Sequence, residues 1–313
     1  MLENICFFSS LRILVILLSQ YSQVRNVIMI FMKRIAYILV AAASLSLFSS
    51  CGESVEEQAA RVLQTARTAY ENGDYQSAKI QLDSLKLQFP KAFEARREAL
   101  KLTREVELAE QQRSVACFDS LLLVKRGELE SMLQSGGFTF EKNEKYQEVG
   151  NFMVASQAPM KNLNNSYLRG QVDEKGVMNI TSIYKGRAIG HNKVKVSCGD
   201  SFAESVNPLN VYTSKHMGVT TERADFRFGK DEGIIGFIVL NNNKSIKVEL
   251  SGKSTHSYTM RKEDVKAIAS LYDLSMQLRT IEELEASRQE ALRHIEFVKR
   301  NKQRSEAADA VVE

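Results

Sequence analysis

The stretch ESMLQSGGFTFEK, residues 130–142, separates two regions of different hydrophobic period. Before it, apolar residues recur at steps of three and four, the spacing of one face of an α-helix. Ser135-Gly136-Gly137 interrupts that pattern. After it, apolar and polar residues alternate, which is the period of a β-strand. We therefore predict an α+β protein in which a long helix leads directly into a β domain.

Two long helices are predicted, one on each side of the β region. Residues 92–134 carry an apolar seam with one polar interruption, made by Val115, Phe118, Leu122, Lys125, Leu129 and Met132. Residues 261–302 carry a second seam, made by Leu271, Leu274, Leu278, Ile281, Glu285, Arg288, Leu292 and Ile295. This spacing is typical of coiled coils, so we expect an antiparallel stalk followed by a tail at 303–313. The alternative is that each apolar stripe packs on a different globular surface.

The region 138–260 is predicted to be an inserted antiparallel β sandwich or small barrel of seven or eight strands. Residues 194–198, 225–228 and 246–250 alternate between apolar and polar positions. Residues 234–240 are apolar throughout and predict a central strand. Asp173–Gly176 and Asn241–Asn243 have the composition of hairpin turns.

Residues 59–91 predict a helical hairpin. Small residues at Ala66 and Ala78 allow two helices to approach closely, and Asn72-Gly73-Asp74 supplies a turn in which glycine tolerates a positive φ. The pattern resembles one tetratricopeptide repeat, carried by Ala66, Tyr70, Gly73, Tyr75, Ala78, Leu82, Leu85 and Pro90. A single repeat cannot bury its apolar face alone. We therefore expect a protein-interaction surface that involves Tyr70, Tyr75 and Leu82.

The stretch LVAAASLSLFSSCGESVEEQ, residues 39–58, predicts how the protein is anchored. A basic start, a short apolar run and small residues before Cys51 are typical of a secretory signal peptide. Leu47–Cys51 resembles a bacterial lipobox, with Phe48 where leucine is usual. The resemblance implies lipidation of Cys51. Residues 1–31 are interpreted as an over-extended start, 32–50 as the signal peptide and 51–58 as an acidic tether. The alternative for residues 1–31 is a membrane-associated extension, with Ile5–Leu18 as a short membrane segment.

The resemblance to bacterial envelope lipoproteins further implies an outer-membrane location, on either the periplasmic or the exposed face. Gly52 is not the aspartate that commonly retains lipoproteins in the inner membrane, and the acids after it resemble surface-export tethers. The whole chain has 42 basic and 38 acidic residues, but four of the basic residues and one acid precede Cys51, which leaves 38 and 37 from Cys51 onward. That balance lacks the basic footprint of a nucleic-acid-binding protein.

The sequence carries few patterns that indicate catalysis or metal binding. Gly199-Asp200-Ser201 matches the opening of an esterase block, but the helix and the later Asp-x-x-His that the block needs are missing, so we interpret it as a turn. His191, His216, His256 and His294 show no metal-ligand spacing. Cys117 and Cys198 are interpreted as small hydrophobic residues, with a disulfide between them left open. We expect no metal, no cofactor and no enzymatic activity.

The leading hypothesis is a lipid-anchored, non-enzymatic envelope scaffold that meets the membrane through Cys51 and a protein partner through the hairpin. The alternative is a β-domain receptor for a glycan or small ligand, because Tyr167, Tyr184, Tyr212 and Tyr258 lie on or beside strands. Core packing is the competing explanation for these tyrosines. A hydrolase is a third alternative.

Overall fold

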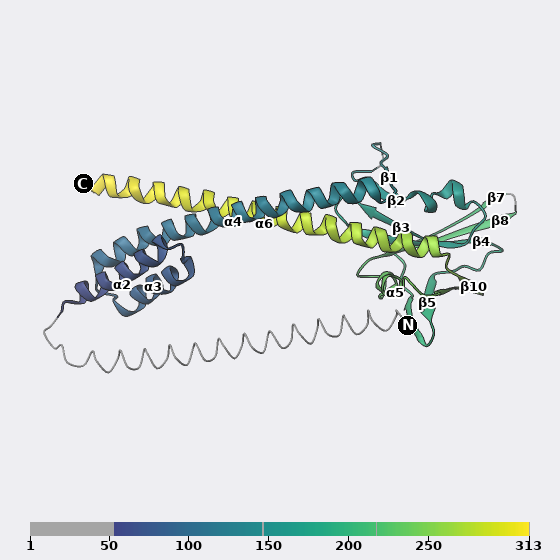
Figure 1. Ribbon diagram of the computed structural model, residues 1–313, viewed down its shortest axis with the longest axis horizontal. Coiled ribbons are helices and arrows are strands. Elements are labelled where there is room, and N and C mark those ends of the chain that lie inside the picture. The colour runs from purple at the N-terminus through teal and green to yellow at the C-terminus, as the bar shows by residue number, and fades with distance from the viewer. Residues whose placement is uncertain (1–52, 146, 217, 313) are drawn as a thin grey trace, which may run out of the picture. The chain divides into compact units, whose positions relative to one another are not determined.

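The chain is an α+β protein, as the sequence predicts. The computed structural model describes residues 53–145, 147–216 and 218–312, which contain five α-helices and two antiparallel sheets (Figure 1). The expected start, signal peptide and lipidated Cys51 lie outside the described residues. The described chain forms two compact units, residues 53–68 with 80–99 and residues 69–79 with 100–312.

Helix α2 (Val55–Glu71) begins inside the segment that was expected to be a tether. Ser54 and Glu57 form a reciprocal capping box at its start. The Ser54 amide donates to the Glu57 carboxylate at 2.9 Å, and the Glu57 amide donates to the Ser54 hydroxyl at 3.2 Å. These two bonds satisfy backbone donors that a helix terminus leaves open, so the acidic residues of 51–58 start a helix instead of solvating a loop.

The core of the first unit consists mainly of small residues. Its members come from α2, from α3 (Tyr75–Gln88) and from the beginning of α4 (Phe93–Ser135). The fully or almost fully buried ones are Ala59, Ala66, Leu82, Leu85, Ala92, Ala95 and Ala99. The Glu56 carboxylate accepts a bond from the Ala95 amide at 2.6 Å. The start of α4 therefore supplies cover that a lone hairpin lacks.

In the second unit, α4 and α6 (Lys262–Val312) run antiparallel (Figure 1). Polar contacts fix their register. Arg126 pairs with Glu285 at 2.6 Å, and Arg288 pairs with Asp119 at 2.5 Å. Nearer the sheets, the Gln277 amide donates to the Lys125 carbonyl at 2.8 Å. The predicted antiparallel pairing is therefore present, and the polar position Lys125 of the first seam lies beside Gln277.

Helix α6 changes partner along its length. Leu271 and Leu274 belong to the apolar core of the β region, whereas Ile281, Ile295 and Val298 are buried farther along the helix. The first part of α6 therefore packs on the β region, and the later part pairs with α4 as the stalk prediction expects. The helix also continues to Val312, through the segment 303–313 that was predicted to be a tail.

Ten short strands make the two sheets, more than the seven or eight predicted. The six-stranded sheet has the order β1-β2-β3-β4-β8-β7, and the four-stranded sheet has the order β10-β9-β5-β6. The strands of the first are β1 (Phe138–Glu141), β2 (Asn151–Val154), β3 (Tyr167–Asp173), β4 (Met178–Gly186), β7 (Asn210–His216) and β8 (Val219–Arg227). Those of the second are β5 (Lys193–Cys198), β6 (Ser201–Ser205), β9 (Lys247–Ser251) and β10 (Thr255–Thr259). Two single turns of 3₁₀ helix, η2 (Ala155–Gln157) and η3 (Pro159–Asn162), lie between β2 and β3.

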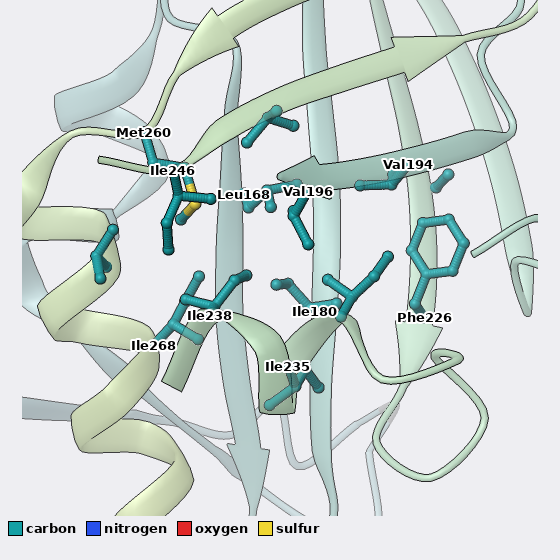
Figure 2. Close-up of a cluster of buried hydrophobic side chains, with 14 of the residues drawn as sticks. Leu168, Ile180, Val194, Val196, Phe226, Ile235, Ile238, Ile246, Met260 and Ile268 are labelled. Atoms are coloured by element: carbon teal, nitrogen blue, oxygen red, sulfur yellow. The ribbon is translucent and has the colours of Figure 1, made fainter. Parts of the chain in front are cut away.

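The two sheets share one hydrophobic core with α5 (Ile234–Leu240) and α6 (Figure 2). Its buried side chains include Leu168, Ile180 and Phe226 from the larger sheet, Val194 and Val196 from the smaller sheet, and Ile235, Ile238 and Ile268 from the helices. Burial of large aliphatic side chains contributes roughly 1.5–3 kcal/mol each, so this core is the main stabilising feature of the second unit.

Residues 234–240 form the helix α5, and the prediction of a central strand there is wrong. A continuous apolar run of seven residues has no period that separates a strand from a buried helix. The deciding residue is Asp231, whose buried carboxylate accepts bonds from the amides of Ile235 at 2.7 Å and Gly229 at 3.1 Å. Asn241 ends the helix, so Asn241–Asn243 link a helix to β9 and not one strand to another.

Candidate functional site

The sequence-predicted interaction residues Tyr70 and Tyr75 lie on either side of the turn between α2 and α3. Their ring centroids are 6.2 Å apart, and both side chains are half-buried. Leu82 is only 4% exposed. It belongs to the helical core and does not present its side chain to a partner in this conformation.

The turn itself is set by backbone and side-chain bonds. The Gly73 amide donates to the Tyr70 carbonyl at 2.9 Å, and Gly73 adopts a φ of 73° that few other residues tolerate. Asp74 caps α3, because its carboxylate accepts a bond from the Ser77 amide at 3.0 Å. The hydroxyl and the amide of Ser77 lower the pKa of Asp74 below its ordinary value. Asp74 therefore stays ionised at the mouth of the turn.

An open cavity of about 420 Å³ lies between this turn and α4. It is lined by Gly73, Asp74, Tyr75, Gln76, Glu110, Arg113, Ser114 and Cys117. Lys79 binds both oxygens of Glu110, at 2.7 and 2.9 Å, which fixes α3 against α4 on one side of the cavity. Arg113 donates to the Gly73 carbonyl at 3.3 Å. The cavity thus combines an aromatic ring, a guanidinium group and two carboxylates.

Cys117 is exposed and Cys198 is half-buried, and both are free thiols. The disulfide that the sequence left open is therefore not formed. Cys117 lies on α4 and Cys198 on β5, and the exposed thiol of Cys117 lines the cavity.

A second cluster lies in the β region, and its residues were not predicted. Ser182 Oγ lies 2.8 Å from His191 Nε2, and His191 Nδ1 lies 3.0 Å from a carboxylate oxygen of Glu222. Since an ionised carboxylate only accepts hydrogen bonds, Nδ1 carries the proton and Nε2 faces the serine hydroxyl. The order serine, histidine, carboxylate is that of a nucleophilic triad.

Burial argues against nucleophilic chemistry at this cluster. Ser182 and His191 are 0% exposed and Glu222 is 1% exposed, so a substrate has no path to the hydroxyl in this structure. The Glu222 carboxylate also accepts the amides of Ile189, Gly190 and His191 at 2.8–2.9 Å. Burial by itself raises the pKa of Glu222, but these amides and the His191 ring outweigh it and lower the pKa below its ordinary value. The cluster holds the loop before β5 against β4 and β8.

One signal in the sequence could have revealed Glu222. Thr220, Ala224 and Phe226 alternate along β8 on the buried side, and Glu222 occupies the same series. A carboxylate at a core position of an alternating strand needs buried donors. The donors to Glu222 come from residues 189–191, about 30 positions earlier in the sequence. The pairing of β4 with β8 brings them close to the Glu222 carboxylate.

Gly199 and Asp200 form the two-residue turn of the β5–β6 hairpin, with Cys198 paired to Ser201, so the turn interpretation of Gly-Asp-Ser is confirmed. Tyr167 and Tyr184 are buried and Tyr258 is half-buried, whereas Tyr212 is 58% exposed. Core packing therefore explains Tyr167 and Tyr184.

Among the described residues, no group of histidine, cysteine or acidic side chains is placed to hold a metal ion. Within that same part of the chain, no helix has the length and apolar character needed to cross a membrane. Comparisons with known protein families, with curated proteins and with solved structures find no match for this chain.

Proposed function

We propose that this chain is a lipid-anchored protein of the bacterial cell envelope that acts as a non-enzymatic scaffold. Cys51 supplies the membrane attachment, and the cavity between the α2–α3 turn and α4 receives a protein partner. The location that the lipobox resemblance favours is the outer membrane.

The observation that carries this proposal is the cavity at the turn. Its 420 Å³ open onto a surface where Tyr75 offers an aromatic ring and Arg113 offers guanidinium donors. Aromatic and arginine side chains are enriched at the residues that dominate protein–protein binding energies. The turn residues are fixed by their own hydrogen bonds, so a partner that docks there meets a surface that needs little reordering.

The buried cluster of Ser182, His191 and Glu222 supports a structural role for the β region. A nucleophile must reach its substrate, and Ser182 is shielded from solvent. We therefore propose that the cluster stabilises the β region and takes no part in a reaction.

Photo-crosslinking in cells tests the scaffold proposal. A photoreactive amino acid replaces Gln76, an exposed residue that lines the cavity, or Lys86, an exposed residue of α3 that does not. We expect a discrete protein adduct in the membrane fraction from position 76 and little from position 86. Arg113→Glu should reduce the adduct at position 76, because it removes the guanidinium donor and reverses the charge.

Two results would contradict the proposal. Equal adduct yields from positions 76 and 86 would indicate random collision in the membrane. An adduct at position 76 that is unchanged by Arg113→Glu would show that the cavity does not select the partner.

A further inference from the structure

Strand β7 is an open edge of the six-stranded sheet (Figure 1). It is last in the strand order, and β8 is its only neighbour among the described strands. Six of its seven residues, Asn210–His216, are exposed. The outer side of an edge strand carries backbone amides and carbonyls without a ladder partner, which pair readily with a further strand. β7 therefore offers its backbone to a binding partner.

This edge has few of the features that block pairing between sheets. Such features are short strands, charged side chains, prolines and bulges. β7 has seven residues, whereas the other edge strands β1, β10 and β6 have four, five and five. Lys215 is the only lysine, arginine or acid in β7, and Pro208 lies before the strand. The pairing with β8 runs from Asn210 to His216 without a bulge.

Apolar side chains are exposed along the same edge. Val211 and Tyr212 are 52% and 58% exposed, and Leu209, directly before the strand, is 50% exposed. Val211 and Tyr212 point to opposite faces of the sheet, because side chains alternate along a strand. A strand that pairs with β7 therefore covers apolar surface on both faces and also forms backbone hydrogen bonds.

The sequence of β7 is complementary to itself in one antiparallel register. A two-fold axis through Tyr212 places this residue opposite Tyr212 of a second copy. Val211 then lies opposite Thr213, and Asn210 lies opposite Ser214. Aromatic pairs and pairs of β-branched residues stabilise adjacent strands. Each of these pairs occurs twice, once on each side of the axis, as a two-fold interface requires.

The same register keeps like charges apart. Lys215 lies opposite Leu209, six residues or about 20 Å along the strand from Lys215 of the second copy. Arg223, which pairs with Tyr212 from β8, lies three strand spacings, or about 14 Å, from Arg223 of the second copy. A two-fold axis through Lys215 would instead place two ammonium groups opposite each other, which is destabilising. Charge therefore favours the axis through Tyr212 over one through Lys215.

We propose that β7 binds β7 of a second copy of this chain, antiparallel and edge to edge, so that the two six-stranded sheets form one continuous sheet. An unrelated extended peptide would account for the open edge, but not for the match of Val211 with Thr213 and of Tyr212 with itself. The contact lies outside the cavity of the scaffold proposal and does not depend on it.

Disulfide formation between copies tests this pairing in membranes of cells that express the full chain. The background carries Cys117→Ser and Cys198→Ala, and a cysteine replaces Tyr212 or, as the matched control, the exposed Arg223 of β8. Opposed Cα atoms in antiparallel strands are about 4.5–5.5 Å apart, which a disulfide spans. We expect at least about tenfold more linked dimer from Tyr212→Cys than from Arg223→Cys, whose Cα atoms are about 14 Å apart.

Charge substitutions in the Tyr212→Cys chain test the register. Val211→Lys with Thr213→Lys places lysines opposite lysines and should reduce the linked dimer by about tenfold or more. Val211→Glu with Thr213→Lys also adds two charged side chains to the edge, but it places a glutamate opposite a lysine on each side of the axis. This second variant should keep the linked dimer, because opposite charges attract across the strands.

The proposal is overturned if Tyr212→Cys yields no more linked dimer than Arg223→Cys, or if the two charge variants yield equal amounts. It is also overturned if the cysteine at position 212 is linked to a protein of a different mass and not to itself, because the edge then binds another partner. These outcomes are independent of the crosslinking at position 76.

Discussion

Glu222 is an ionisable residue at a core position of β8. Hydrogen-bond donors from one loop stabilise its buried carboxylate. Three backbone amides and the His191 ring donate to its carboxylate. A buried charge is costly unless it is fully hydrogen-bonded. Here the donors match the acceptor capacity of the carboxylate, so the residue orders the loop between β4 and β5 and does not destabilise the core.

Replacement of Glu222 by glutamine should lower the free energy of unfolding by about 1–3 kcal/mol, because the amide group cannot satisfy the same donors. Urea denaturation followed by circular dichroism measures this change. Glu204→Gln is the control, since Glu204 is an exposed strand residue of β6. A control that loses as much stability as Glu222→Gln would contradict a special role for the buried carboxylate.

The same substitution should flatten the acid side of the stability profile. The folded-state pKa of Glu222 lies below its ordinary value of 4.5. Its contribution is therefore fully present above that value and is lost as the pH falls through the folded-state pKa. Between pH 6 and pH 3, the unchanged chain should lose more stability than Glu222→Gln does. Parallel profiles for the two chains would show that this carboxylate does not contribute to the acid dependence.

At the scale of elements, the β3–β4 turn packs closely against α6. Gly176 has a φ of 77°, and a Cβ atom there would lie 2.8 Å from the backbone of both Ser275 and Arg279. The Ser275 hydroxyl donates to the Gly176 carbonyl at 2.6 Å. The turn therefore requires glycine both for its backbone conformation and for the approach of the helix.

A matched pair of substitutions separates those two requirements. Gly176→Ala and Gly199→Ala both place alanine at a positive φ, which costs about 1–2 kcal/mol, but the space around Gly199 is open. We expect a clearly larger fall in the urea midpoint for Gly176→Ala. Equal shifts would mean that the turn moves away from α6 without cost.

The register of α4 against α6 gives a crosslinking prediction. Cysteines at Asp119 and Arg288, in a Cys117→Ser background, should be joined by a short bismaleimide, because the native side chains are in contact. The pair Leu122 and Leu274, which similar spacing along the two seams would suggest, should not react. Leu122 lies beside Glu285 and Arg288, whereas Leu274 is buried in the core shared with the sheets. Crosslinking of the second pair in preference to the first would indicate a different register.

The elements with a clear period were predictable, and those without one were not. The seam from Val115 to Met132 and the alternation in β5, β8 and β9 identify helix and strands, because burial on one face imposes a period. Residues 234–240 are apolar throughout, so the sequence shows no period there, and the bond that the Asp231 carboxylate accepts from the Ile235 amide favours a helix. The spacing of apolar residues along each helix does not determine which residues of α4 and α6 face each other. The pairing of Asp119 with Arg288 is therefore visible only in the structure.

The candidate sites follow the same division. Tyr70 and Tyr75 were predictable because the turn that places them is local, with only Gly73 and its neighbours involved. Ser182, His191 and Glu222 come from separate segments that strand pairing unites, and sequence spacing does not encode that pairing.

At the scale of the whole molecule, the proposed anchor is tested by Cys51→Ala. Labelling of the unchanged chain with a fatty-acid analogue should be lost in this variant, because the thiol is the expected acylation site. Cys117→Ala serves as the control, since Cys117 is an exposed thiol outside the lipobox. Persistent membrane attachment of Cys51→Ala after signal cleavage would contradict lipidation at this residue.

The antiparallel course of α4 and α6 has a mechanical consequence. Leu100 and the end of α6 lie at the same end of the helix pair, away from the sheets, so tension between them opens the pair like a zipper instead of shearing it. The contacts would yield in sequence, first Arg104 with Ser305, then Asp119 with Arg288, then Arg126 with Glu285. Each is a solvent-accessible polar contact that resists little. The helix pair therefore opens before the sheets are loaded, and the strands carry tension only after the two helices have separated.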